Sequence, residues 1–287
     1  MLERGKIMPP PWIALPDIER GSMHWRMGQG EWYILEKYMP WYRELSEEDK
    51  AEYHRLFPEP ISWRGYFSRE PECETLNVRA LYVDLWRENG QPLYTRKQLC
   101  EAHENGEAPE YLFFWGHQPR YPGAVDKSCL SQWWQSAFVY GGRAYTCMEQ
   151  CMMAGKAMAF RDDDALNKIL ETQDPSQIKK LGRQVQLFDE KTWNQVKYPL
   201  IVAGNYCKFS QNEQLRSFLL STGNRVLVEA SPYDCVWGIG LSADDPDSRD
   251  PHKWRGTNLL AFALMEVREE IRRVFANAEL CCNPFER

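Results

Sequence analysis

A glutamate and a lysine stand seven residues apart in a predicted helix and could act together on a substrate. The segment Tyr145–Phe160 is helix-like and carries Glu149 and Lys156. Two helical turns place both side chains on one face, with about 10 Å between their Cα atoms. This separation is too long for an i,i+4 ion pair and is close to the span of a nucleoside. The pair could supply a proton donor and a nucleophile, or it could be an exposed acid and base beside an apolar stripe.

A third ionisable group lies in the apolar run of a predicted strand, residues 224–230. The run contains Glu229, which alternation places on the opposite face from Val226 and Val228. A carboxyl group there is either turned to solvent or buried with a partner. Solvent exposure is the default interpretation of Glu229.

The residues that follow this strand form an unusual turn. Asp234 comes after Pro232, where aspartate commonly binds its own backbone in an Asx turn. Trp237 precedes Gly238 and Gly240, and paired glycines beside an indole permit close backbone approach to a bound group. The alternative for Trp237 is a core position at a bend.

Helical patterns and short strands alternate from residue 111 onward, which predicts an α+β fold that is mostly helical. Asp162 or Asp163 begins one helix, and Asp174 with Pro175 begins the next. Apolar residues then recur at helical spacing through the segment around Trp193 and again in residues 256–275. A strand is predicted at 224–230, and the mixed pattern of short strands and helices begins at 111–116.

The first hundred residues differ from the rest in being crowded with aromatic and charged residues and interrupted by prolines. Residues 75–86 have strand or short-helix character, and the polar passage 88–110 carries turn signals. We therefore predict an N-terminal extension of unassigned role at 1–105 and a second domain at 106–287.

Composition limits the class of protein. The net charge of −6 argues against a protein that coats nucleic acid non-specifically. Three prolines near the N-terminus interrupt any secretory apolar region, and no run reaches membrane-spanning length. Nine cysteines without a Cys-x-x-Cys pair favour reduced thiols and a cytoplasmic or nuclear location. Cys147 and Cys151 are four residues apart and could be metal ligands, but cysteines of this kind are more commonly buried as small apolar residues.

Several blocks of the sequence resemble the NADAR (YbiA-like) family. The stretch TCMEQCMMAGK, Thr146–Lys156, is similar to the helix of that family that carries a glutamate and a lysine. The resemblance covers about residues 111 to 275. The other matching blocks are Lys179–Val185, Thr192–Lys197, Asn205–Gly240 and Gly256–Glu269.

Two segments depart from the family pattern. Relatives usually show an F-S-N-F type motif where this chain has CLSQWW, Cys129–Trp134. They usually have a glycine after the leucine in the segment that reads NLLAF here, Asn258–Phe262.

The resemblance implies an N-glycosidase that needs no cofactor and no metal. It implies Glu149 and Lys156 as the reacting pair, and a pocket shaped by Trp193, Asp234 and Trp237. Glu149 would protonate the leaving base. Lys156 would capture the anomeric carbon as a Schiff base or hold a phosphate.

The other implied residues would bind the substrate. The tryptophans would stack on base or ribose, and Asp234 would orient a ribose hydroxyl. Backbone N–H groups at Gly238 and Gly240 would approach a diphosphate.

Three hypotheses follow for the function. The first is a hydrolase that removes ADP-ribose from guanine, in guanosine or a small nucleotide or in DNA or RNA, as in repair or recycling. The second is the same chemistry on phosphoribosylated intermediates of riboflavin synthesis. The third is a module that binds ADP-ribose or NAD without cleaving it. No membrane partner is expected, and the oligomeric state is left open.

Overall fold

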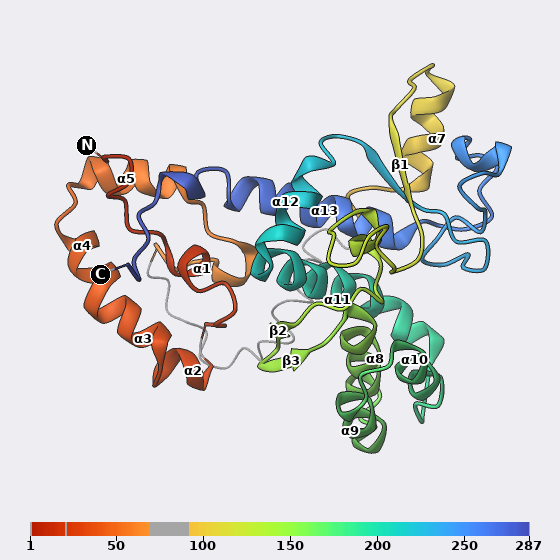
Figure 1. Cartoon of the computed structure of the whole chain (residues 1–287), viewed down its shortest axis with the longest axis horizontal. Helices are drawn as coiled ribbons and strands as arrows, with labels where there is room; N and C mark the ends of the chain where they lie inside the picture. The colour runs from red at the N-terminus through yellow and green to blue at the C-terminus, as the bar shows by residue number, and fades with distance from the viewer. Residues whose placement is uncertain (1, 21, 69–91, 287) are drawn as a thin grey trace.

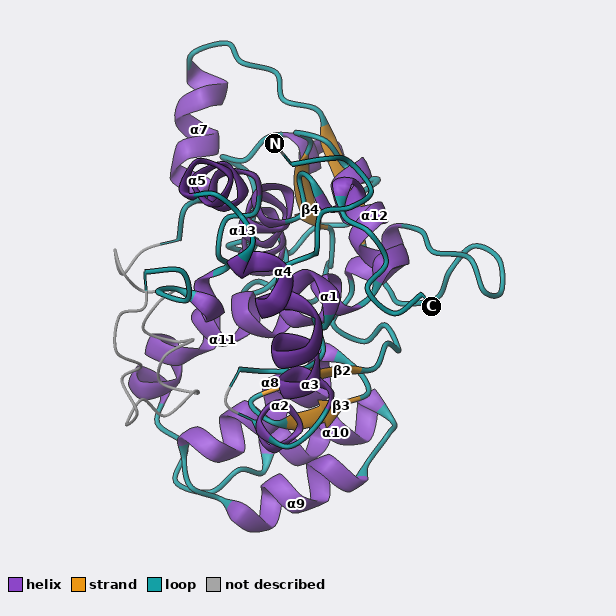
Figure 2. Ribbon diagram, turned by 90° about the vertical axis from the view of Figure 1, so that its left-hand side faces the viewer, coloured by secondary structure: helices purple, strands orange, loops and turns teal. Residues whose placement is uncertain are grey.

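The computed structural model describes residues 2–20, 22–68 and 92–286, which form a mostly helical protein with two small sheets (Figures 1 and 2). The predicted α+β class is confirmed. The elements in these ranges are α1 (Pro11–Ala14), α2 (Met23–Arg26), α3 (Gln29–Tyr33), η1 (Ile34–Tyr38), α4 (Met39–Arg43), α5 (Glu47–Leu56), η2 (Ile61–Trp63), α7 (Arg96–Glu104), β1 (Tyr111–Phe114), η3 (Lys127–Leu130), β2 (Phe138–Tyr140), β3 (Arg143–Tyr145), α8 (Met148–Ala159), α9 (Asp163–Glu171), α10 (Pro175–Arg183), α11 (Glu190–Gln211), α12 (Glu213–Ser221), β4 (Val226–Glu229), η4 (Pro246–Arg249), α13 (Leu259–Val274) and η5 (Ala278–Leu280).

Helix α11 forms the centre of the molecule (Figure 1), and its residues 199–210 are all buried. Helices α8, α12 and α13 pack against it. A Cβ atom added to Gly155 of α8 would lie 2.4 Å from Leu200 Cδ2, so glycine lets α8 approach α11 closely. This contact fixes the helix that carries Glu149 and Lys156.

Side-chain caps begin the helices that surround α8. The Asp162 carboxylate accepts a hydrogen bond from Ala165 N at 2.9 Å, and the Asp174 carboxylate accepts one from Ser176 N at 2.9 Å. Both predicted caps are confirmed. The helix predicted over 145–160 begins only at Met148, because Tyr145 belongs to β3 and pairs with Phe138.

The strands that lead into the site are parallel. β1 pairs with β4 in a register that sets Phe114 opposite Glu229. Val226, Leu227 and Val228 are all buried, and α13 packs on β4. Because parallel strands end at the same edge of a sheet, the segments that follow β1 and β4 lie together.

The N-terminal elements build a second cluster of buried side chains, which includes Tyr33, Tyr38 and Tyr53. Both chain ends lie beside these elements in Figure 1. Ile7 forms a parallel β-bridge with Cys281, and Cys281 packs against the cluster. The last residues of the predicted 106–287 part are therefore in contact with the N-terminal part.

The passage 88–110, for which the sequence indicates turns, contains helix α7. A capping box begins this helix: the Thr95 side chain accepts from Gln98 N, and the Gln98 side chain accepts from Thr95 N. The prediction missed this signal. The strand or short helix predicted for 75–86 lies outside the described residues.

Cys147 and Cys151 are buried in the main core, as predicted for small apolar residues. In the described ranges, no helix combines the length and the apolar character that crossing a bilayer requires.

Candidate active site

A cavity of about 820 Å³ opens where the ends of β1 and β4 face helices α8, α10 and the start of α11. This volume falls within the usual range for small-molecule sites. Five of the residues predicted from sequence line it: Glu149, Lys156, Trp193, Asp234 and Trp237. The strand exit thus forms one wall of the cavity and the Glu149 helix forms another.

Glu149 is a buried carboxyl group in the first turn of α8, with 2% of its surface exposed. The Trp133 indole donates a hydrogen bond to this carboxyl group. Its Oε1 atom has no hydrogen-bond partner among the described residues. Burial raises the pKa of Glu149 to about 7 and the charge of Asp234 adds to the rise, while Lys179 and Arg183 oppose it. Glu149 can therefore hold or release a proton near neutral pH.

Lys156 is half-buried at the other end of the same helix face. Its Nζ atom donates a hydrogen bond to Gly182 O at 2.8 Å and lies 4.2 Å from the centre of the Phe188 ring. Burial lowers the pKa of Lys156. A larger fraction of this amine is therefore neutral than in water, which suits a nucleophile.

Asp234 organises the turn that follows β4. Its Oδ1 atom accepts hydrogen bonds from Val236 N and Trp237 N, each at 2.8 Å. The default Asx turn is confirmed, and it holds Trp237 against the cavity. Trp193 approaches from α11, and both indoles are half-buried. The arrangement leaves two aromatic surfaces for a ring to contact.

Gly238 and Gly240 do not line the cavity, which corrects the prediction that they approach a diphosphate. A Cβ atom on Gly238 would lie 2.8 Å from Glu229 O, so this glycine serves the packing of the turn itself. Gly240 has a φ of +70°, and its N–H donates to Asp234 O at 3.1 Å. That N–H is not free for a phosphate.

Glu229 belongs to the site, although solvent exposure was the default expectation. It lines the cavity, and its Oε2 atom is buried with no hydrogen-bond partner in the described part of the chain. Burial raises the pKa of Glu229 to about 8, helped by the charges of Asp234 and Glu149 and opposed by Lys179. Alternation could not place this residue, because all three preceding residues of β4 are buried.

The CLSQWW segment also contributes to the site through Ser131, Gln132 and Trp133. Lys208 of α11 holds this loop: its buried Nζ atom donates to Cys129 O at 2.7 Å and to Ser131 O at 3.0 Å. Gln132 O in turn accepts from Glu149 N at 2.8 Å. The loop that departs from the family pattern is therefore joined directly to the predicted acid.

Basic side chains border the same cavity. Lys179 and Arg183 reach it from α10, and the Lys179 Nζ atom lies 5.8 Å from the centre of the Trp133 ring. Lys197 reaches it from α11. Together with Lys156 they supply positive charge suited to a phosphorylated ligand.

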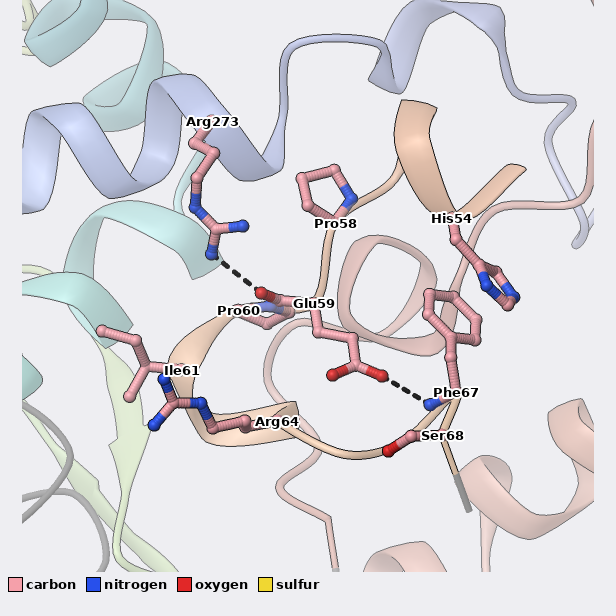
Figure 3. Close-up of a pocket in the computed structure, with 9 residues that line it drawn as sticks. All are labelled: His54, Pro58, Glu59, Pro60, Ile61, Arg64, Phe67, Ser68 and Arg273. Atoms are coloured by element: carbon pink, nitrogen blue, oxygen red, sulfur yellow. Dashed lines mark hydrogen bonds between the residues drawn. The ribbon is translucent and has the colours of Figure 1, made fainter. Parts of the chain in front are cut away.

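A second cavity, of about 620 Å³, lies between the N-terminal part and the end of α13 (Figure 3). The Glu59 carboxylate there accepts hydrogen bonds from Gly65 N and Phe67 N, and Arg273 donates to Glu59 O at 2.8 Å. His54 stacks on Phe67. These contacts pair the Glu59 oxygens within the protein, and none of the predicted site residues lines this cavity.

Comparison with known proteins identifies the family. The NADAR domain model matches residues 113–272, more than half of the chain. The chain belongs to the NADAR family. N-glycosidase R617 of Acanthamoeba polyphaga mimivirus is 41% identical over 169 residues, which cover 57% of this chain and 98% of that relative.

Two further matches were found. The chloroplastic riboflavin biosynthesis protein PYRR of Arabidopsis thaliana is 34% identical over 111 residues, 37% of this chain and 17% of that protein. The NMR structure of Escherichia coli YbiA matches with a TM-score of 0.44 at 24% identity, covering 56% of this chain and 84% of that one. Relatives that bear the name N-glycosidase, from the mimivirus, Nostoc punctiforme and E. coli, support an N-glycosidase activity for this chain.

Proposed function

We propose that this NADAR protein is an N-glycosyl hydrolase that removes ADP-ribose from ADP-ribosylated guanine, with Glu149 and Lys156 as the reacting pair. The observation that carries the proposal is Glu149 itself. It is a buried carboxyl group with an unpaired oxygen, in the wall of a cavity that also presents an amine, two indoles and several cations.

Cleavage of a ribosyl C–N bond needs a proton for the departing nitrogen and tolerance of positive charge at the anomeric carbon. The raised pKa keeps Glu149 partly protonated at neutral pH. Its protonated form gives the proton to the base nitrogen as the C1′–N bond breaks. The carboxylate that remains can then take a proton from water in the hydrolytic step.

Lys156 serves as the nucleophile in this mechanism. Its neutral amine forms a bond to C1′ as the bond from C1′ to the base breaks, and the ribose ring then opens to give a Schiff base. Water adds at C1′ of the Schiff base and the amine leaves, so Lys156 is regenerated and ADP-ribose is released. The lowered pKa of Lys156 favours the neutral amine that this step needs.

The charge of the cavity favours a substrate with a diphosphate. Glu229 is mostly protonated at neutral pH and Glu149 partly so, which leaves the cations of the wall in excess over the carboxylates. The tryptophans would hold the planar base by stacking. Apart from the nucleophile Lys156, the basic residues of the cavity are Lys179, Arg183 and Lys197, and its other carboxyl groups are those of Asp234 and Glu190.

A second candidate is the same bond cleavage on phosphoribosylated intermediates of riboflavin synthesis. The relative named riboflavin biosynthesis protein PYRR favours it, although the matching segment is a small share of that protein. Its substrate would carry one phosphate, so fewer of the cavity cations would be used.

The deciding experiment measures release of ADP-ribose from ADP-ribosylated guanosine by the wild type, Glu149→Gln, Lys156→Ala and the control Glu171→Gln. Glu171 is an exposed carboxylate at the end of α9, away from the cavity. The riboflavin-pathway intermediates are assayed in parallel. We expect cleavage of the guanosine substrate by the wild type and the control, and loss of turnover in the other two variants.

Other results would redirect the assignment. Cleavage of only the riboflavin intermediates would establish the second candidate. Binding of ADP-ribose without cleavage of either substrate would indicate a binding module. Normal turnover by Lys156→Ala would refute the covalent step while leaving Glu149 as the acid.

A further inference from the structure

Three side chains that line the cavity each have a buried oxygen atom without a hydrogen-bond donor among the described residues. These atoms are Gln132 Oε1, Glu149 Oε1 and Glu229 Oε2. A buried acceptor without a partner costs free energy, and native proteins rarely leave several together. The cluster therefore indicates a ligand that brings O–H or N–H donors.

We propose that Glu229 is a substrate-contacting residue that, together with Gln132, binds the hydroxyl groups of the ribose at the reacting bond. The proposal deepens the N-glycosidase function proposed above and rests on it for the place of the reacting bond. Neither residue was assigned a role from the sequence.

Gln132 and Glu229 both lie near the predicted acid, Glu149. Gln132 is joined to Glu149 through the bond from Glu149 N to Gln132 O, 2.8 Å long. Glu229 is close enough for its ionisation to respond to the charge of Glu149, and both respond to Lys179 and Asp234. A bond cleaved at Glu149 places the neighbouring atoms of the substrate within this cluster.

The chemistry of those neighbouring atoms decides the ligand class. In a ribosyl substrate C2′, next to the anomeric carbon, and C3′ carry hydroxyl groups, and each hydroxyl can donate one hydrogen bond, which matches Gln132 Oε1 and Glu229 Oε2. A phosphate has no donor at neutral pH and would add negative charge beside the carboxyls. The N–H groups of a base are the other source of donors, and the experiment below separates the two.

Glu229 is held rigidly for such a role. Its backbone N–H donates to Asn258 Oδ1 at 2.9 Å, and its carbonyl oxygen accepts from Ile239 N at 2.9 Å. Asn258 is fully buried in a left-handed conformation with φ of +58°, and its amide also donates to Leu227 O at 3.0 Å. The end of β4 is thus fixed from both sides, which positions the carboxyl group before a ligand arrives.

The burial of Glu229 supports this assignment. Because the pKa of Glu229 is raised to about 8, its carboxyl group is mostly neutral at pH 7 and can both accept and donate a hydrogen bond. A neutral carboxyl group also avoids repulsion of the phosphates elsewhere in the cavity.

The test uses ligands that contain the sugar but no base, so it does not depend on whether ADP-ribosylated guanosine is the substrate. Binding of ribose 5-phosphate and of 2-deoxyribose 5-phosphate is measured by ligand-observed NMR with the full chain. The proteins are the wild type, Glu229→Gln, Glu229→Leu, Gln132→Leu and the exposed control Glu171→Gln. Near-ultraviolet circular dichroism checks that each variant is folded.

We expect the wild type and Glu171→Gln to prefer the ribose compound about 10-fold, the usual scale for one well-formed hydrogen bond. Glu229→Gln should keep most of this preference, since an amide still pairs with hydroxyls. Glu229→Leu and Gln132→Leu should lose it while binding the deoxy compound as before.

Two results would overturn the proposal. One is equal binding of the two sugars by the wild type. The other is an unchanged preference in a folded Glu229→Leu variant, which would leave the N–H groups of the base as the source of donors.

Discussion

Replacing Glu149 with glutamine should stabilise the fold at neutral pH although it abolishes turnover. The pKa of this carboxyl group rises from its ordinary value of 4.5 to about 7 in the folded protein, chiefly because it is buried. Each pKa unit corresponds to about 1.36 kcal/mol. Ionised Glu149 therefore costs the native state about 3 kcal/mol relative to a carboxylate in the unfolded chain.

The direction of the pH dependence follows from proton binding. Below pH 4.5 the carboxyl group is protonated in both states, so its favourable contribution is fully present. As the pH rises through 4.5 toward about 7, the unfolded chain releases the proton first, and stability falls. Above this window the full cost remains. Glutamine cannot ionise, and its amide oxygen can still accept the Trp133 hydrogen bond.

The assay is urea unfolding of the wild type, Glu149→Gln and Glu171→Gln at about pH 4.5 and about pH 8. The free energy of unfolding of Glu149→Gln minus that of the wild type should be about 3 kcal/mol larger at the higher pH than at the lower pH. Glu229 is present in all three proteins, so its own contribution cancels to first order. An equal pH dependence in the wild type and Glu149→Gln would show that Glu149 is not buried as a neutral acid.

Three further predictions concern catalysis and packing. With Glu149 as the protonated acid and Lys156 as the neutral nucleophile, kcat/KM should rise with pH below about 7 and level off above it, because loss of the Glu149 proton then offsets the gain in neutral Lys156; a rate that keeps rising with pH above about 7 would show that Glu149 is not the acid. Trp237→Ala should lower kcat/KM by about 5- to 150-fold, the equivalent of about 1–3 kcal/mol of stacking, and an unchanged value would remove the indole from the binding surface. Gly182→Ala should lower the free energy of unfolding by about 1–3 kcal/mol, because its Cβ atom would lie 2.0 Å from Met153 Sδ. A thermal unfolding midpoint equal to that of the wild type would show that Met153 simply moves aside.

The sequence predicted the parts of the site that depend on local signals. The spacing of Glu149 and Lys156 needs only helix geometry, and Asp234 needs only the turn chemistry of a short side chain. All three residues lie in the predicted elements, and all three line the same cavity. The capping aspartates Asp162 and Asp174 belong to the same class.

The remaining features depend on contacts between segments that are distant in the sequence. Glu229 is buried because β4 pairs with β1 and is covered by α13, and alternation within one strand carries no information about that cover. Gln132 reaches the site because Lys208, more than seventy residues later, holds its loop. At Gly238 the sequence correctly predicted a close approach of another group to the backbone. The approaching group is the protein's own Glu229 carbonyl and not a ligand.

The position of Glu149 shows how opposing forces set a pKa suited to acid–base chemistry. The first turn of a helix favours an anion by about 0.3–1 kcal/mol, and Lys179 and Arg183 act in the same direction. Burial outweighs all of these influences, since the pKa still rises to about 7. The two sets of forces act at different stages of the reaction. Burial keeps the proton on Glu149 until a leaving group takes it, and the helix start and the cations then stabilise the carboxylate that remains. An exposed glutamate at the same helix position would be ionised before the substrate arrived, and a buried one without these cations would hold its proton too tightly to release it.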